Sequence, residues 1–96
     1  MKYIDTFREG MHIADVYLCK NKQIAMTKNG KEYGNLVLQD KTGTIDAKIW
    51  DLGSPGVGDF ETMDYVHVEA DITLFQNSNQ MNIRRIRRAQ EGEYVE

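Results

Sequence analysis

The chain has 96 residues, a formal net charge of −3 and one cysteine. This length suits a single domain with one hydrophobic core, and an apolar share of 41% is too high for a disordered chain. A net acidic chain is a poor general binder of polyanions, and one thiol makes neither an internal disulfide nor a cysteine zinc site. The sequence contains no apolar run of about 20 residues and starts without the apolar core of a signal peptide, so we expect a cytoplasmic protein without a membrane partner.

Alternation of apolar and polar residues predicts five β-strands, over 12–20, 33–39, 44–50, 65–75 and 80–86. The polar segment 21–31 is expected to be a loop. Turn-forming residues at 40–43 join the second and third strands into a hairpin. In the last strand, Ile86 breaks the alternation, which predicts a bulge. The glycine-rich segment 52–64 leaves room for at most a short helical turn, over 59–63.

Five strands with short turns and one irregular connection predict an all-β fold. The expected architecture is a small five-stranded Greek-key barrel, and its strand order matches an OB-fold. An SH3-like barrel is the structural alternative, although it usually lacks so long a fourth strand and the insert before it. We expect the domain to span 1–90, with the acidic stretch 91–96 as the start of a linker.

Four strings of the sequence look familiar when they are taken together. They are Thr27-Lys28-Asn29-Gly30-Lys31, Leu38-Gln39-Asp40-Lys41-Thr42-Gly43, Ala47-Lys48-Ile49-Trp50-Asp51 and Asn82-Ile83-Arg84-Arg85-Ile86-Arg87-Arg88-Ala89. At this spacing they resemble the N-terminal OB-fold domain of the YhaM-type (HD-domain) 3′-to-5′ exoribonucleases, over about 4–94. The resemblance implies a domain that grips single-stranded RNA or DNA for its own C-terminal hydrolase domain.

That HD hydrolase domain, with the divalent metal it would hold, is missing from this sequence. Neither His12 nor His67 is followed by Asp, and the chain carries no G-x-S-x-G string and no phosphate-cradling glycine loop. We therefore expect no catalytic residue, no metal ligand and no cofactor in these 96 residues, and the chain itself is not expected to be an enzyme.

An OB barrel holds a single strand on the outer face of its second and third strands, between the loops that join strands one to two and four to five. Aromatic side chains there stack on bases, and cations track the phosphates. The alternation places Trp50, the only tryptophan, on that outer face. The candidate nucleic-acid-binding residues are Lys22, Lys28, Lys31, Tyr33, Asn35, Lys48, Trp50, Phe75, Asn82 and Arg84.

Two alternatives remain open at this point. Trp50 is either a stacking platform or a structural lid over one end of the barrel. The domain as a whole is either a nucleic-acid binder or a protein-interaction module that docks onto its hydrolase domain or forms a homo-oligomer, and the net acidic charge favours the second. Salt separates them, because only phosphate contacts give a linear fall of log affinity with log salt.

Overall fold

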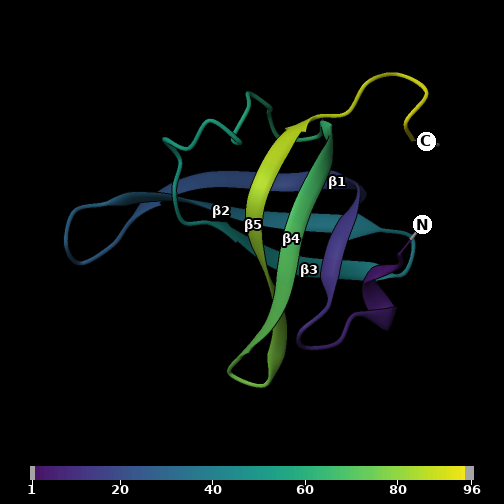
Figure 1. Cartoon of the computed structure of the whole chain (residues 1–96), viewed down its shortest axis with the longest axis horizontal. Helices are drawn as coiled ribbons and strands as arrows, with labels where there is room; N and C mark the ends of the chain where they lie inside the picture. The colour runs from purple at the N-terminus through teal and green to yellow at the C-terminus, as the bar shows by residue number, and fades with distance from the viewer. Residues whose placement is uncertain (1, 95–96) are drawn as a thin grey trace.

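The computed structural model describes residues 2–94, and these form a closed β-barrel (Figure 1). The elements are a short 3-10 helix and five strands: η1 (Ile4–Thr6), β1 (His12–Met26), β2 (Glu32–Asp40), β3 (Gly43–Ile49), β4 (Tyr65–Phe75) and β5 (Ser78–Arg88). Around the barrel the strand order is β1-β2-β3-β5-β4, and only the β3–β5 pair is parallel. The predicted all-β, five-stranded barrel is therefore confirmed.

The core follows from the alternation that predicted the strands. Leu36 and Leu38 of β2 and Ile45 and Ile49 of β3 are at most 5% exposed, as their apolar positions indicated. Buried residues from all five strands form one cluster inside the barrel, together with Ile4, Phe7 and Phe60. In a closed barrel every strand has one inner and one outer face, so the outer residues of β2 and β3 are held in a fixed arrangement by this core.

β1 is longer than the sequence indicated, and the expectation of a loop over 21–31 was wrong. The strand continues to Met26 because its second half pairs with β2, for example Ala25 opposite Tyr33, while its first half pairs with β4. Only the tip turns, with the Thr27 amide donating to the Lys31 carbonyl at 2.8 Å. In Figure 1 this β1–β2 hairpin extends from the barrel as an arm.

The connection between β3 and β4 is the glycine-rich loop that the sequence allowed, but the helical turn over 59–63 does not form. The loop's polar groups bond to strands instead: the Ile86 amide donates to Gly56 at 3.0 Å, and the Met63 amide donates to Cys19 at 2.7 Å. These bonds hold the loop along β5 and β1. They also place Phe60, which is 1% exposed, in the barrel core.

A bulge in β5 confirms the prediction made from Ile86. Glu69 of β4 pairs with Arg85, and the next residue, Ala70, pairs with Ile83, so Arg84 is the extra residue. Ile83 and Ile86 both point inward and are at most 6% exposed. The two arginines between them consequently point outward together.

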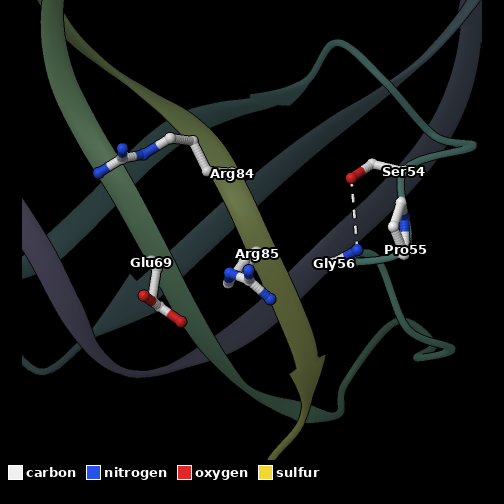
Figure 2. Close-up of a pocket in the computed structure, with 6 residues that line it drawn as sticks. All are labelled: Ser54, Pro55, Gly56, Glu69, Arg84 and Arg85. Carbon is white, nitrogen blue, oxygen red and sulfur yellow. Dashed lines mark hydrogen bonds between the residues drawn. The ribbon is translucent and has the colours of Figure 1, made fainter.

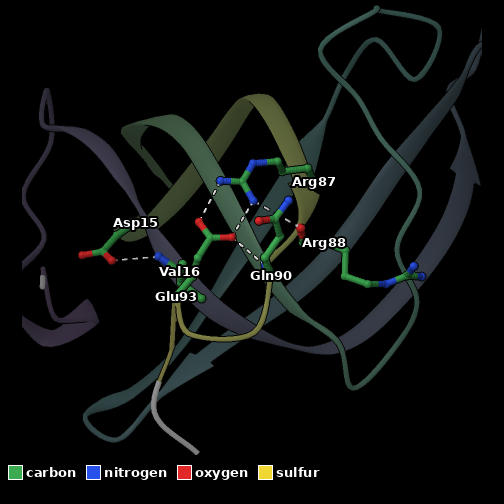
Figure 3. Close-up of polar contacts among 6 residues, drawn as sticks. All are labelled: Asp15, Val16, Arg87, Arg88, Gln90 and Glu93. Atoms are coloured by element: carbon green, nitrogen blue, oxygen red, sulfur yellow. Dashed lines mark hydrogen bonds and ion pairs between the residues drawn. The ribbon is translucent and has the colours of Figure 1, made fainter.

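The residues after β5 are docked on the barrel rather than extended from it. Arg87 donates to both carboxylate oxygens of Glu93, at 2.7 and 2.8 Å, and the Gln90 amide donates to the same carboxylate (Figure 3). Tyr94 stacks on Tyr65 of β4 with ring centroids 4.1 Å apart. Within the expected linker 91–96, the part up to 94 thus contacts the domain, and 95–96 lie outside the described residues.

Candidate nucleic-acid interface

An exposed tryptophan, packed against a half-buried tyrosine, marks the outer face of β2 and β3. Trp50 comes directly after β3 and Tyr33 lies near the start of β2, and their ring centroids are 5.0 Å apart with an interplanar angle of 33°. Trp50 is 45% exposed. The indole therefore presents an aromatic face to solvent while Tyr33 packs against it.

A hydrogen bond from β5 fixes the orientation of this indole. Trp50 Nε1 donates to Asn82 Oδ1 at 3.0 Å, and Asn82 Nδ2 donates in turn to Thr73 Oγ1 at 3.1 Å. The amide oxygen and nitrogen of Asn82 are both used, so this side chain has little freedom to turn. Trp50 is held in place from β5 and β4 as well as by Tyr33.

Lys48 brings a positive charge beside the aromatic pair. It lies opposite Asn35 on β2 and opposite Asn82 on β5, and its ammonium group donates to Asn35 Oδ1 at 2.5 Å. Among residues 2–94 no carboxylate lies within 4.0 Å of this ammonium, and the bond to a neutral amide leaves two of its protons free. The lysine is thus available for a phosphate next to the stacking surface.

Arg84 extends the same face along β5, where it meets acidic residues. Its guanidinium donates to Asp71 Oδ1 at 3.3 Å, and Asp71 also contacts His12. Asp46 lies on the outer face of β3, opposite Val37. The face is therefore mixed in charge, which suits a moderate and salt-sensitive affinity for polyanions rather than a strong one.

Phe75 lies at the tip of the β4–β5 hairpin and is 58% exposed. Strand alternation puts it on the same face as Thr73 and Asp71. The hairpin turns through Gln76 and Asn77, whose positive φ values of 51° and 66° are those of a tight two-residue turn. The alternation of apolar residues over 65–75 also predicts Leu74 on the inner face, and that prediction is wrong, because Leu74 is 50% exposed where the hairpin extends beyond the core.

The three lysines expected in the first loop are separated by the structure. Lys28 and Lys31 are exposed at the tip of the β1–β2 arm. Lys22 lies within β1, opposite core residue Leu36, where its ammonium donates to the Phe60 carbonyl at 2.7 Å and lies 4.4 Å from the Phe60 ring centroid. Lys22 therefore stands on the other face of the sheet, and we remove it from the candidate interface.

The structure also bears on the two interpretations of Trp50. A lid over the barrel would be buried, whereas nearly half of Trp50 is exposed on the outer face. The aromatic side chains within the core cluster are instead Phe7, Tyr17 and Phe60. The geometry thus favours a platform.

Sequence reasoning missed Thr73 and Asp71, which support Asn82 and Arg84 from β4. The available signal was the alternation of β4, since both positions share the face of Phe75.

Among residues 2–94, no three His, Cys, Asp or Glu side chains are grouped as a metal site requires. Within that same range, no helix has the length and apolar character to span a membrane.

Known proteins resemble both the sequence and the fold. No family model matches the chain. A 3′-5′ exoribonuclease YhaM of Geobacillus sp. (strain WCH70) is 40% identical over 82 residues, covering 84% of this chain and 25% of the relative. The YhaM of Bacillus pumilus (strain SAFR-032) is 32% identical over 94 residues, covering 98% of this chain and 30% of the relative. The chain thus spans about a quarter of the length of these curated relatives.

Among solved structures, the second OB-fold domain of replication protein A from Methanococcus maripaludis superposes with a TM-score of 0.66 at 16% identity. The match covers 99% of this chain and 98% of that one. At this identity the likeness shows the fold alone, and it settles the choice between barrels: the chain is an OB-fold domain. The sequence matches confirm the resemblance to YhaM-type exoribonucleases. This chain corresponds to one part of those longer proteins, and that part is an OB-fold domain in this chain.

Proposed function

We propose that this domain binds single-stranded nucleic acid, RNA foremost, and holds it as the substrate-gripping part of a longer 3′-to-5′ exoribonuclease. The observation that carries the proposal is exposed Trp50, packed against Tyr33, fixed by Asn82 and flanked by Lys48. Stacking of a base on an aromatic face contributes about 1–3 kcal/mol and tolerates any sequence. A fixed aromatic face beside an ammonium group with unused donors is the combination that such binding needs.

The two flanking hairpins support the same proposal. The arm carries Lys28 and Lys31 at its exposed tip, and the β4–β5 hairpin presents Phe75. These are the loops that border the ligand groove in OB-folds. A solved replication protein A heterotrimer bound to ssDNA superposes with a TM-score of 0.67 at 20% identity, covering 92% of this chain and 64% of that one. The curated relatives are named exoribonucleases, which makes RNA the first substrate to test.

Under this proposal the domain itself does no chemistry. A hydrolase domain elsewhere in the longer protein, with its divalent metal, would remove the nucleotides, and this domain would supply affinity for the strand. Holding a substrate beside a catalytic centre raises the effective concentration of the reacting end, so the domain would lower the KM of the exonuclease more than it changes kcat.

A titration tests the proposal. A labelled single strand of about 10 nucleotides is added to the domain at low and at moderate salt, with a duplex of the same sequence as the control. We expect binding to the single strand that quenches Trp50 fluorescence and weakens with salt at a log–log slope of about −0.7 per phosphate contact. Absence of binding at low salt, or equal binding to the duplex, would contradict the proposal.

The second candidate is a protein-interaction module, and exposed apolar side chains favour it. Met26, Met63, Leu74 and Phe75 are each at least 50% exposed, and the net charge of the chain is negative. In this case the domain would dock onto its own hydrolase domain or onto a second copy. Sedimentation across a concentration series tests for self-association, which apolar contacts would leave nearly independent of salt.

A further inference from the structure

A cleft lies next to the candidate interface and shares Arg84 with it. It is open, has a volume of about 500 Å³, and lies between the β3–β4 connection and strands β4 and β5 (Figure 2). The residues that line it are Ser54, Pro55, Gly56, Glu69, Arg84 and Arg85. In Figure 2, Arg84 extends across β4, and Arg85 lies between Glu69 and the loop.

The β5 bulge joins this cleft to the interface. Because Arg84 is the extra residue, Arg84 and Arg85 are both exposed on the outer side of the barrel. Arg84 contacts Asp71, which lies opposite Asn82, the residue that bonds Trp50. A single-stranded nucleic acid that stacks on Trp50 can therefore continue along β5 past Arg84 to Arg85.

Arg85 differs from the other arginines of β5 in its charge environment. Arg84, Arg87 and Arg88 have carboxylate oxygens at 3.3, 2.7 and 2.8 Å. Within the described part of the chain, Arg85 has no such partner within 4.0 Å, although Glu69 lies opposite it on β4. A guanidinium with free donors at the side of a cleft is suited to bind a phosphate group.

The loop side of the cleft is built for close approach. Ser54 Oγ accepts the Gly56 amide at 3.3 Å, which leaves its hydroxyl proton free to donate. A Cβ on Gly56 would lie 3.0 Å from Arg85 Cγ and 3.1 Å from the Arg84 carbonyl oxygen. Glycine at position 56 therefore lets the loop backbone pack against the first carbons of the Arg85 side chain, and it leaves the cleft beside the guanidinium open.

We propose that this cleft is a phosphate subsite, in which Arg85 and Ser54 hold a backbone phosphate of the single strand beyond Trp50. The inference rests on the proposed function and extends the path of the nucleic acid from β2 and β3 across β5 to the β3–β4 connection. The cleft is lined by no aromatic ring, so it recognises the backbone rather than a base. The Glu69 carboxylate repels a phosphate in this cleft, so replacing it with a neutral side chain should raise the affinity of the subsite for phosphate.

The test compares Arg85→Gln with Arg88→Gln, which removes the same charge from the same strand but outside the cleft. Each is titrated with homopolymeric RNA of about 4 to about 16 nucleotides, the range of site sizes for OB-folds. For Arg85→Gln we expect unchanged Kd with the shortest RNA, and with the longest RNA a Kd at least about fivefold weaker and a salt slope smaller by about 0.7. Glu69→Gln should tighten binding of long RNA only.

Two negative results are distinguishable. If the wild-type domain binds no RNA of any length, the proposed function fails and the subsite with it. If the wild type binds but Arg85→Gln behaves as Arg88→Gln at every length, the subsite alone is refuted. A loss that is equal for short and long RNA would also refute it, because it would place Arg85 in the primary groove. Melting temperatures of the variants exclude unfolding as the cause.

Discussion

Truncation of Trp50 to alanine is the change that separates a binding platform from a structural element. In the structure Trp50 has two specific supports, the Tyr33 ring at 5.0 Å and the hydrogen bond to Asn82 at 3.0 Å. Its remaining surface faces solvent, with 45% of the residue exposed. Trp50→Ala removes both supports and the exposed stacking face, and it leaves the core cluster unchanged because Trp50 is not part of it.

The expected loss of stability follows from those two contacts. An aromatic pair contributes about 0.5–1.5 kcal/mol and a hydrogen bond about 0.5–1.5 kcal/mol, so the free energy of unfolding should fall by about 1–3 kcal/mol. Phe60→Ala is the matched comparison, because Phe60 is 1% exposed within the core. Truncation of such a buried aromatic costs about 3–5 kcal/mol. Urea unfolding of both variants measures the difference.

Truncation of Trp50 should also weaken binding directly, while the domain stays folded. Loss of one stacked base corresponds to about 1–3 kcal/mol, which is a weakening of Kd by about 5- to 150-fold. Trp50→Phe retains an aromatic face without the Asn82 bond and should keep most of the affinity. The reasoning is refuted if folded Trp50→Ala binds single-stranded RNA within twofold of the wild type, or if it unfolds as readily as Phe60→Ala.

Three further predictions concern the fold. Gly34→Ala should lower the free energy of unfolding by about 1–3 kcal/mol in a urea titration, because the new Cβ would lie 3.2 Å from buried Ile49; an unchanged midpoint would contradict this packing. Burial raises the pKa of the Cys19 thiol to about 11, so a thiol reagent at pH 8 should label it only as fast as the domain opens, and labelling at the rate of a free thiol would disprove its burial. The hydrogen bond from Arg87 lowers the pKa of Glu93 to about 2. The stability that ionised Glu93 gives to the docked tail is therefore present above its unfolded pKa of 4.5 and is lost as pH falls through about 2. A carbon-13 titration of the Glu93 carboxyl should give a midpoint of about 2, and Arg87→Ala should raise that midpoint.

The barrel was predictable because each strand has one face in the core and one in solvent. Alternation of period two records that difference directly, and it identified Leu36 and Ile49 as inner residues and Trp50 as an outer one. The bulge in β5 was predictable for the same reason, since Ile86 is inward but out of phase with Ile83. The outward positions of Tyr33, Asn35 and Lys48 followed from the same pattern, and their role in binding stays a prediction.

The sequence pattern did not predict several features that lie beyond the barrel core. The second half of β1 does not alternate, so its continuation to Met26 was missed. The alternation of β4 continues beyond the core into the tip of the β4–β5 hairpin, so Leu74 was predicted inward although it is exposed. A second bulge, between Cys19 and Asn21, puts Lys22 on the face of the core residues. Single-sequence patterns do not locate such a bulge where no apolar residue marks the change of phase.

Long-range contacts were equally hidden. Phe60 fills the core from within a glycine-rich and acidic segment, and Glu93 is held by Arg87 although its surroundings read as a linker. Both contacts depend on which segments the barrel brings together, and neither has a periodicity of its own. That Arg85, unlike Arg84, Arg87 and Arg88, has no carboxylate partner among residues 2–94 could likewise be seen only once the fold had brought Asp71, Glu93 and Asp64 beside the other three.

The most direct test of the central claim is an amide NMR titration of the domain with a short single-stranded RNA. The chain has one tryptophan, so the Trp50 indole N–H gives a single side-chain signal of its kind. The account predicts that this signal shifts together with the amides of Asn35, Lys48 and Asn82, while those of Phe60 and Glu93 stay in place. Shifts confined to the docked tail or the β3–β4 connection, with the indole signal unmoved, would contradict it.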